Sequence, residues 1–141
     1  MGTISKNFSY REFETSEIAT ERGICNIITS FEVRDSVKAL VLNVLQPLRD
    51  AWGQSLKINS GYRCPELNKI VSRASNSQHM KGEAADVASD NPYELAKLAK
   101  GLNLPFDQMI LYPTFVHFSH KLKGEQRGYI GYDESYKGKR L

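Results

Sequence analysis

The feature that most constrains the fold is a helical repeat of apolar residues between residues 33 and 52. These side chains recur every three or four positions, which is the period of one face of an α-helix. They are Val37, Leu40, Val41, Val44, Leu45, Leu48 and Trp52. The pattern predicts a long amphipathic helix from Val33 to about Gly53, whose apolar face other elements must cover. Pro47 lies inside it and has no backbone donor, so we expect either a kink or two separate helices.

The remainder of the chain predicts short elements of both kinds. Strand patterns occur at residues 56–60, 84–87, 109–112, 115–118 and, as an edge strand, 129–132. Helical patterns occur at residues 66–71 and 90–102, while residues 72–82 are polar and typical of a loop. Residues 1–30 predict one or two short helices, with Ser9 and Thr15 as candidate caps and Gly23 as a stop. This order predicts the α+β class, with helices packed on a small, largely antiparallel sheet.

Size and composition favour one domain over residues 1–141. The 141 residues are 40% hydrophobic and 25% charged, which is typical of a soluble globular domain with its own core. The net charge of +3 is concentrated after residue 120, in a basic C-terminal extension of residues 121–141. That extension favours either approach to an anionic polymer or a solvated surface terminus, and no nucleic-acid motif accompanies it. Cys25 and Cys64 lack the spacing of a structural metal site, and whether they pair stays open.

The densest chemical signal runs from Ser77 to Asp86, in the sequence Ser-Gln-His-Met-Lys-Gly-Glu-Ala-Ala-Asp. It places the imidazole of His79 and the carboxylate of Asp86 close together in the chain, with small residues that allow it to fold back. A catalytic zinc ion takes three protein ligands and leaves a fourth position for water, so a third ligand must lie elsewhere.

His117 and His120 are the other histidines, and strand alternation places them on opposite faces. Both would bind one metal only through a bulge or a strand end. His117 lies further inside the apolar stretch and is the stronger candidate. Taken singly, a histidine on a strand or a buried aspartate is more typical of ordinary hydrogen bonding, and only the combination indicates a metal site.

The same residues resemble the zinc D-alanyl-D-alanine carboxypeptidases and their relatives, the D-Ala-D-Ala dipeptidases and phage endolysins. The family signature SxHxxGxAxD is matched at every fixed position, by Ser77, His79, Gly82, Ala84 and Asp86. Residues 60–68 (SGYRCPELN), 106–110 (FDQMI) and 115–117 (FVH) resemble further family segments, as do residues 7–13 and 23–24. The likeness extends to about residue 120.

The resemblance implies a hedgehog-like α+β fold and one zinc ion held by His79, Asp86 and His117. It implies that Arg63 captures a terminal carboxylate or polarises the scissile carbonyl, with a surface salt bridge as the alternative. Ser77 would bind substrate or fix the loop that carries His79.

The proton acceptor of the reaction is harder to place, because a general base must lie within reach of the attacking water. Many relatives carry an acid or a histidine shortly before the last zinc ligand, but residues 111–116 of this chain contain neither. We rank Asp107 first, His120 second and Glu83 last as candidates. Tyr112 is instead a candidate for stabilising an oxyanion through its hydroxyl.

These implications predict a zinc peptidase that hydrolyses peptide bonds in peptidoglycan stem peptides or cross-links, as a carboxypeptidase or an endolysin-type endopeptidase. Two alternatives stay open: a non-catalytic module that binds wall peptide or a partner protein, and a zinc enzyme acting on another small peptide or amide. We expect a monomer with no nucleic-acid partner and no membrane span. Residues 1–7 show no signal peptide, so we expect cytoplasmic synthesis and action at the cell wall after phage-type release.

Overall fold

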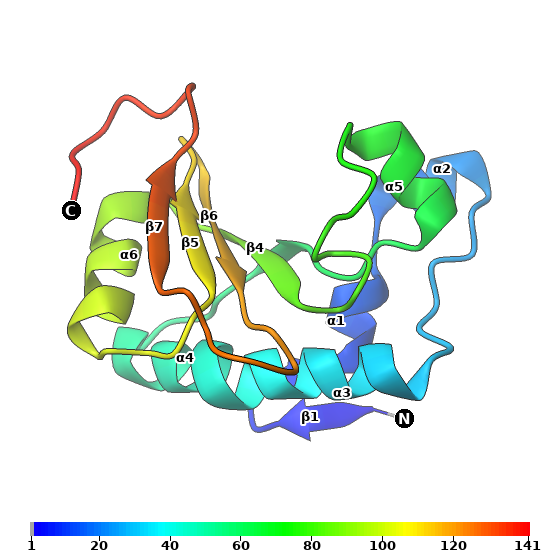
Figure 1. The fold of residues 1–141 in the computed structure, drawn as a ribbon, viewed down its shortest axis with the longest axis horizontal. Coiled ribbons are helices and arrows are strands. Elements are labelled where there is room, and N and C mark those ends of the chain that lie inside the picture. Colours follow the sequence, from blue (N-terminus) through cyan, green and yellow to red (C-terminus); the bar gives the residue numbers. More distant parts are fainter. Residues whose placement is uncertain (1) are drawn as a thin grey trace.

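The computed structural model describes residues 2–141, which form helices packed against a five-stranded sheet and a separate two-stranded hairpin (Figure 1). The strand order of the larger sheet is β3-β4-β6-β5-β7. Its strands are β3 (Ile58–Ser60), β4 (Ala84–Ala88), β5 (Gln108–Leu111), β6 (Phe115–Ser119) and β7 (Tyr129–Tyr132). Every neighbouring pair is antiparallel except β5 and β7, which are parallel. The predicted α+β class with a largely antiparallel sheet is confirmed.

The predicted long helix is continuous but has three parts: α3 (Phe31–Leu40), a π-helical stretch η1 (Val41–Leu45) and α4 (Gln46–Trp52). It begins two residues earlier than predicted, where the Ser30 side chain accepts a hydrogen bond from the backbone N–H of Val33. It ends at Gly53, which adopts a left-handed conformation with φ of 75°. Pro47 is the second residue after the π-helical stretch, whose wider turn makes room for the proline ring and for the backbone donor that it lacks. Pro47 therefore alters the local hydrogen bonding without separating two helices.

The core lies between this helix and one face of the larger sheet, and α3 and α4 run beneath the strands in Figure 1. Six of the apolar helix positions are fully buried: Val37, Leu40, Val41, Val44, Leu45 and Leu48. The sheet contributes Ala85, Val87, Met109, Leu111, Val116 and Phe118. Helix α6 (Pro92–Gly101) contacts β5, β6 and α4, and the side chain of Asn91 caps its first turn. The strands therefore bury alternate residues on this face and present the others to the opposite face.

The N-terminal residues form a hairpin that the sequence did not predict, of β1 (Thr3–Ser5) and β2 (Phe8–Ser9). Two short helices follow as expected, α1 (Tyr10–Glu14) and α2 (Glu17–Arg22). Ser9 caps α1, but Ser16 rather than Thr15 caps α2, because Thr15 is already the residue that ends α1. Helix α5 (Pro65–Val71) precedes the predicted loop, and α2 and α5 lie on the side of the molecule away from the C terminus (Figure 1).

Residues 121–141 pack on the domain and contribute the predicted edge strand, β7. Tyr136 is buried, and the backbone N–H of Leu141 donates to the hydroxyl of Tyr132. Cys25 and Cys64 are both free thiols. No helix within residues 2–141 combines the length and the apolar character needed to cross a membrane.

Candidate metal centre

Sheet register brings two of the predicted ligands together. Asp86 on β4 lies directly opposite His117 on β6, so both side chains project from the same face. Their neighbours Val87 and Val116 point into the core, which fixes the outward direction of the two ligands. Nδ1 of His117 lies 2.9 Å from Oδ1 of Asp86. His117, the histidine favoured by its position inside the apolar stretch, thus lies beside the carboxylate.

The third predicted ligand, His79, lies in the loop between α5 and β4 and is 4% exposed. Its Nδ1 donates a hydrogen bond to the carbonyl of Gly61 at 2.7 Å, because a carbonyl can only accept. Its Nε2 therefore carries the lone pair, and this atom lies 3.5 Å from Oδ1 of Asp86. The backbone N–H of His79 donates to Oγ of Ser77 at 3.1 Å. Gly61 lets its segment pass close to α1, since a Cβ there would lie 2.7 Å from the backbone of Phe13.

The three residues fit a single zinc ion. One ligand atom from each of His79, Asp86 and His117 can be chosen so that all lie within 4.8 Å of one another. Tetrahedral zinc with bonds of 2.0–2.1 Å separates its ligand atoms by about 3.3 Å, so small side-chain movements would close the set. Two imidazole nitrogens and a carboxylate oxygen form a typical catalytic zinc set, and a carbonyl that fixes the tautomer of one imidazole is its usual support.

Electrostatics in the cluster keep the carboxylate ionised and His79 neutral. Burial raises the pKa of Asp86, but its interactions with His117 and His79 outweigh burial and hold this pKa well below its usual range. Burial lowers the pKa of His79, and the opposing effect of Asp86 is smaller. A carboxylate and a neutral imidazole are the protonation states that bind zinc.

Arg63 connects the cluster to a groove. Its Nη2 lies 3.6 Å from Oδ2 of Asp86, and its Nε donates to Oγ of Ser60 at 3.1 Å. Arg63 also lines a groove of about 510 Å³ between the edge strand β3 and helices α2 and α5. The guanidinium group of Arg63 thus lies between the groove and the ligand cluster.

Comparison with known families assigns the chain to one of them. The family model described as Peptidase M15 matches residues 6–120, which include the three clustered residues and all of β3 to β6. The chain belongs to the peptidase M15 family. This confirms the resemblance to the zinc D-Ala-D-Ala carboxypeptidase-like peptidases. A comparison with proteins of curated function found no match.

Tyr112 lies near the cluster of this M15 chain. It follows β5, and its ring stacks on Phe115 with 4.2 Å between ring centroids. Burial raises the pKa of the Tyr112 hydroxyl, and the charge of Asp86 raises it further. The hydroxyl is therefore protonated at neutral pH and available as a donor.

Asp107, the first-ranked proton acceptor, lies in a different setting from the one the sequence suggested. Its carboxylate is fully buried and accepts hydrogen bonds from the backbone and guanidinium of Arg127 and from Gln78. The hydrogen bond from Arg127 lowers the pKa of Asp107 to about 2. A carboxylate with so low a pKa and with its lone pairs occupied is a weak base. The role of Asp107 as base stays a prediction that this geometry does not favour.

The other two predicted proton acceptors are His120, which directly follows β6, and Glu83, which lies in the loop that carries His79. His120 donates its backbone N–H to the carbonyl of Glu83, and its Nδ1 is buried without a hydrogen-bond partner among the described residues. Burial lowers the pKa of His120, so the ring is neutral at neutral pH. Both carboxylate oxygens of Glu83 accept hydrogen bonds, from Gln78 and from the backbone of Leu122.

The sequence did not single out three residues that support this site: Gly61, Gln78 and Arg127. Gly61 belongs to a segment that resembles the family, and Gln78 directly precedes His79, so position in those motifs could have drawn attention to both. Arg127 had no such signal, because it lies beyond the matched residues and within a run of basic side chains.

Proposed function

We propose that this protein is a zinc metallopeptidase that hydrolyses peptide bonds in peptidoglycan stem peptides or cross-links at the bacterial cell wall. The observation that supports it is the cluster of His79, Asp86 and His117 beside Arg63, in a chain of the M15 family. When bound, zinc supplies a Lewis acid that polarises an amide carbonyl and lowers the pKa of a water molecule to about 7.

The three clustered residues would hold that ion through atoms that the structure leaves facing one another. The Gly61 carbonyl keeps the proton of His79 on Nδ1, so Nε2 is the ligand atom of this residue. His117 would offer Nδ1 once this atom loses the proton that it donates to Asp86 in the metal-free protein, and Asp86 would offer a carboxylate oxygen. Because Asp86 stays ionised, the set carries the negative charge that favours a divalent cation.

The groove beside Arg63 supports a peptide substrate in extended form. Its lining includes β3, which is an edge strand of the larger sheet, and an edge strand offers backbone donors and acceptors to an added peptide. The guanidinium of Arg63 suits a terminal carboxylate or a carbonyl oxygen at the end of that peptide. The Tyr112 hydroxyl is a further donor for an oxyanion.

A second candidate function is a non-catalytic zinc-containing module that binds wall peptide. It is favoured by the state of the predicted bases, because Asp107 is paired with Arg127 and Nδ1 of His120 is buried. Nε2 of His120 is therefore the atom to test as a proton acceptor. The two candidates differ in turnover and agree on metal and peptide binding.

The test is to incubate the zinc-loaded protein with intact peptidoglycan and with soluble muropeptides, and to identify the products by mass spectrometry. Chelator-treated protein and the variant His79→Ala are the controls. Chelator-sensitive cleavage would establish the peptidase and identify the bond, whereas bound zinc without product would favour the binding module. Matched peptides with L-alanine in place of D-alanine separate a wall peptidase, which requires the D-residue, from a zinc enzyme with other substrates.

A further inference from the structure

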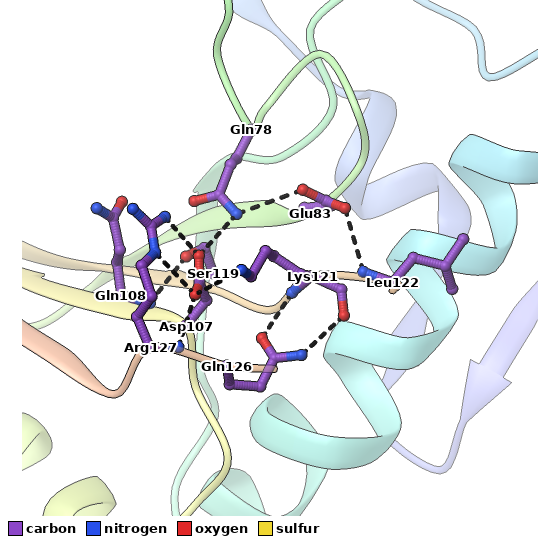
Figure 2. Close-up of polar contacts among 9 residues, drawn as sticks. All are labelled: Gln78, Glu83, Asp107, Gln108, Ser119, Lys121, Leu122, Gln126 and Arg127. Carbon is purple, nitrogen blue, oxygen red and sulfur yellow. Dashed lines mark hydrogen bonds and ion pairs between the residues drawn. The ribbon is translucent and has the colours of Figure 1, made fainter. Parts of the chain in front are cut away.

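We infer that Arg127 is a positioning residue of the metal centre, acting through Asp107 and Gln78 on the loop that carries His79. The inference rests on the metal site of the proposed function and goes beyond it. It assigns a role to a segment that lies outside the family match of residues 6–120. Figure 2 shows the network, in which Gln78 and Arg127 meet at the carboxylate of Asp107.

The pairing of Arg127 with Asp107 uses three donors of one residue. The backbone N–H and Nε of Arg127 donate to Oδ1 of Asp107 at 2.8 and 3.0 Å, and its Nη2 donates to Oδ2 at 2.6 Å. The Asp107 side chain is fully buried, while that of Arg127 is 54% exposed. A two-pronged pair of this kind fixes the direction of the carboxylate as well as its charge.

The fixed carboxylate in turn holds the residue that precedes the ligand. Nε2 of Gln78 donates to Oδ2 of Asp107 at 3.1 Å and lies 3.3 Å from Oε1 of Glu83. The carbonyl of Gln78 accepts the backbone N–H groups of Lys81 and Glu83, which closes the turn around His79. Gln78 thus ties the turn to the sheet through its side chain and shapes the turn through its backbone.

A second connection holds the far end of the same turn. Oε2 of Glu83 accepts the backbone N–H of Leu122 at 3.1 Å, and the carbonyl of Glu83 accepts that of His120 at 2.8 Å. The side chain of Gln126 makes two hydrogen bonds to the backbone of Lys121, which stabilises this part of the chain (Figure 2). The loop has no strand partner at His79. The backbone N–H of Arg63 donates to the His79 carbonyl at 3.1 Å, and the contacts of Gln78 and Glu83 add to this support on either side of His79.

The positioning role and the role of Asp107 as proton acceptor make different predictions. A base that is lost reduces turnover and leaves metal affinity unchanged. A positioning pair that is lost displaces Nε2 of His79 and weakens metal binding, with turnover falling as a consequence.

The experiment measures zinc dissociation constants by chelator competition, and the visible absorption spectrum of the cobalt-substituted protein, for matched variants. Three variants should each weaken zinc binding by about tenfold, which is the effect expected when a residue that supports a ligand is lost. They are Gln78→Ala, Arg127→Ala and Asp107→Asn, and each should also alter the cobalt spectrum. Arg127→Lys should restore part of the affinity, because lysine keeps the charge but not the fork of donors. Arg140→Ala removes another arginine of the same segment, one that lies over the ring of Tyr132, and should match the wild type.

Gln78→Ala decides the outcome if the Arg127 variant does not fold, since it leaves the Asp107–Arg127 pair intact. Wild-type zinc affinity and cobalt spectrum in folded Gln78→Ala would overturn the inference. So would an Asp107→Asn variant that binds zinc normally and does not cleave. Neither measurement needs a substrate. A protein that binds zinc without cleaving peptidoglycan would contradict the proposed peptidase activity, but the zinc affinities of the variants would still test the positioning role of Arg127.

Discussion

The metal centre has two kinds of support. Asp86 and His117 face each other across β4 and β6, and each of these strands is hydrogen bonded on both sides. His79 lies in an irregular loop, held by the Gly61 carbonyl, the Ser77 hydroxyl and the side chain of Gln78. Sheet register therefore fixes two ligands relative to each other, whereas contacts from distant segments fix the third.

This difference has a consequence for local stability. The central strands are part of the core and open only when the domain unfolds, whereas a loop held by a few separate hydrogen bonds opens at lower free energy. Among residues that support the ligands, those that hold the loop should therefore have the largest effect on the metal affinity of the centre. Substitutions that leave the sheet intact are the way to test that comparison.

The largest effect should come from removing a ligand. Structural zinc sites bind with roughly 10–16 kcal/mol shared among their ligands, so the loss of one ligand should weaken zinc binding about a thousandfold. His79→Ala and His117→Ala should behave alike in a chelator competition measurement, although one lies in the loop and the other on a strand. His120→Ala is the matched histidine control and should bind zinc as the wild type does. Full metal content in His79→Ala would remove His79 from the ligand set.

The next largest effect should come from Gly82, where the loop packs on α3. Gly82 has φ of 75°, and a Cβ there would lie 2.6 Å from the carbonyl oxygen of Val33. Gly82→Ala should lower the free energy of unfolding by about 3 kcal/mol, from the left-handed conformation together with overpacking. Urea denaturation of the metal-free protein measures this.

Gly101→Ala is the control, since an added Cβ meets no atom within 4 Å at the end of α6. It should leave the free energy of unfolding unchanged or slightly raised. Equal effects of the two substitutions would mean that the loop adapts freely to α3, which is contrary to the close contact at Val33.

The two kinds of support also explain what the sequence could predict. The strand ligands follow from local patterns, since alternation separates His117 from His120 and places it opposite the core side chains. The long helix was predicted from its periodicity, but the π-helical stretch before Pro47 was not, because its hydrogen bonding depends on where the proline ring must fit. The N-terminal hairpin was missed because two- and three-residue strands are too short to show alternation.

The support of the loop could not be predicted in the same way. Asp107 was ranked as a base because it precedes His117 in the sequence, but in the structure it pairs with Arg127, which comes twenty residues after it. No periodicity relates two side chains that meet through the packing of β7 beside β5. Contacts between distant charged residues need the three-dimensional arrangement, and here they decide how the third ligand is held.

A smaller effect should appear when acid loosens the Asp107–Arg127 pair. The pKa of Asp107 is 3.8 in an unfolded chain and about 2 in the folded protein, so the unfolded state binds the proton more readily. The resulting stabilisation, about 2 kcal/mol, is fully present above about pH 4 and is lost as the pH falls through about 2. Urea denaturation at a series of pH values gives the free energy of unfolding of the metal-free wild type and of Asp107→Asn. The difference between the two proteins should shrink as the pH falls from about 4 to about 2. A constant difference would mean that the pair does not stabilise the fold.

The smallest effect should come from Ser77, whose two predicted roles can be separated. Its Oγ accepts the backbone N–H of His79 at 3.1 Å, which is the contact expected of a residue that fixes the loop. Losing one such hydrogen bond costs about 1 kcal/mol, so Ser77→Ala should weaken zinc binding about fivefold. Ser77→Thr keeps the acceptor and should restore the affinity. A substrate-binding role predicts instead an unchanged zinc affinity and a raised KM for wall peptides, and this result would leave the Gly61 carbonyl and the side chains of Gln78 and Glu83 to hold the loop.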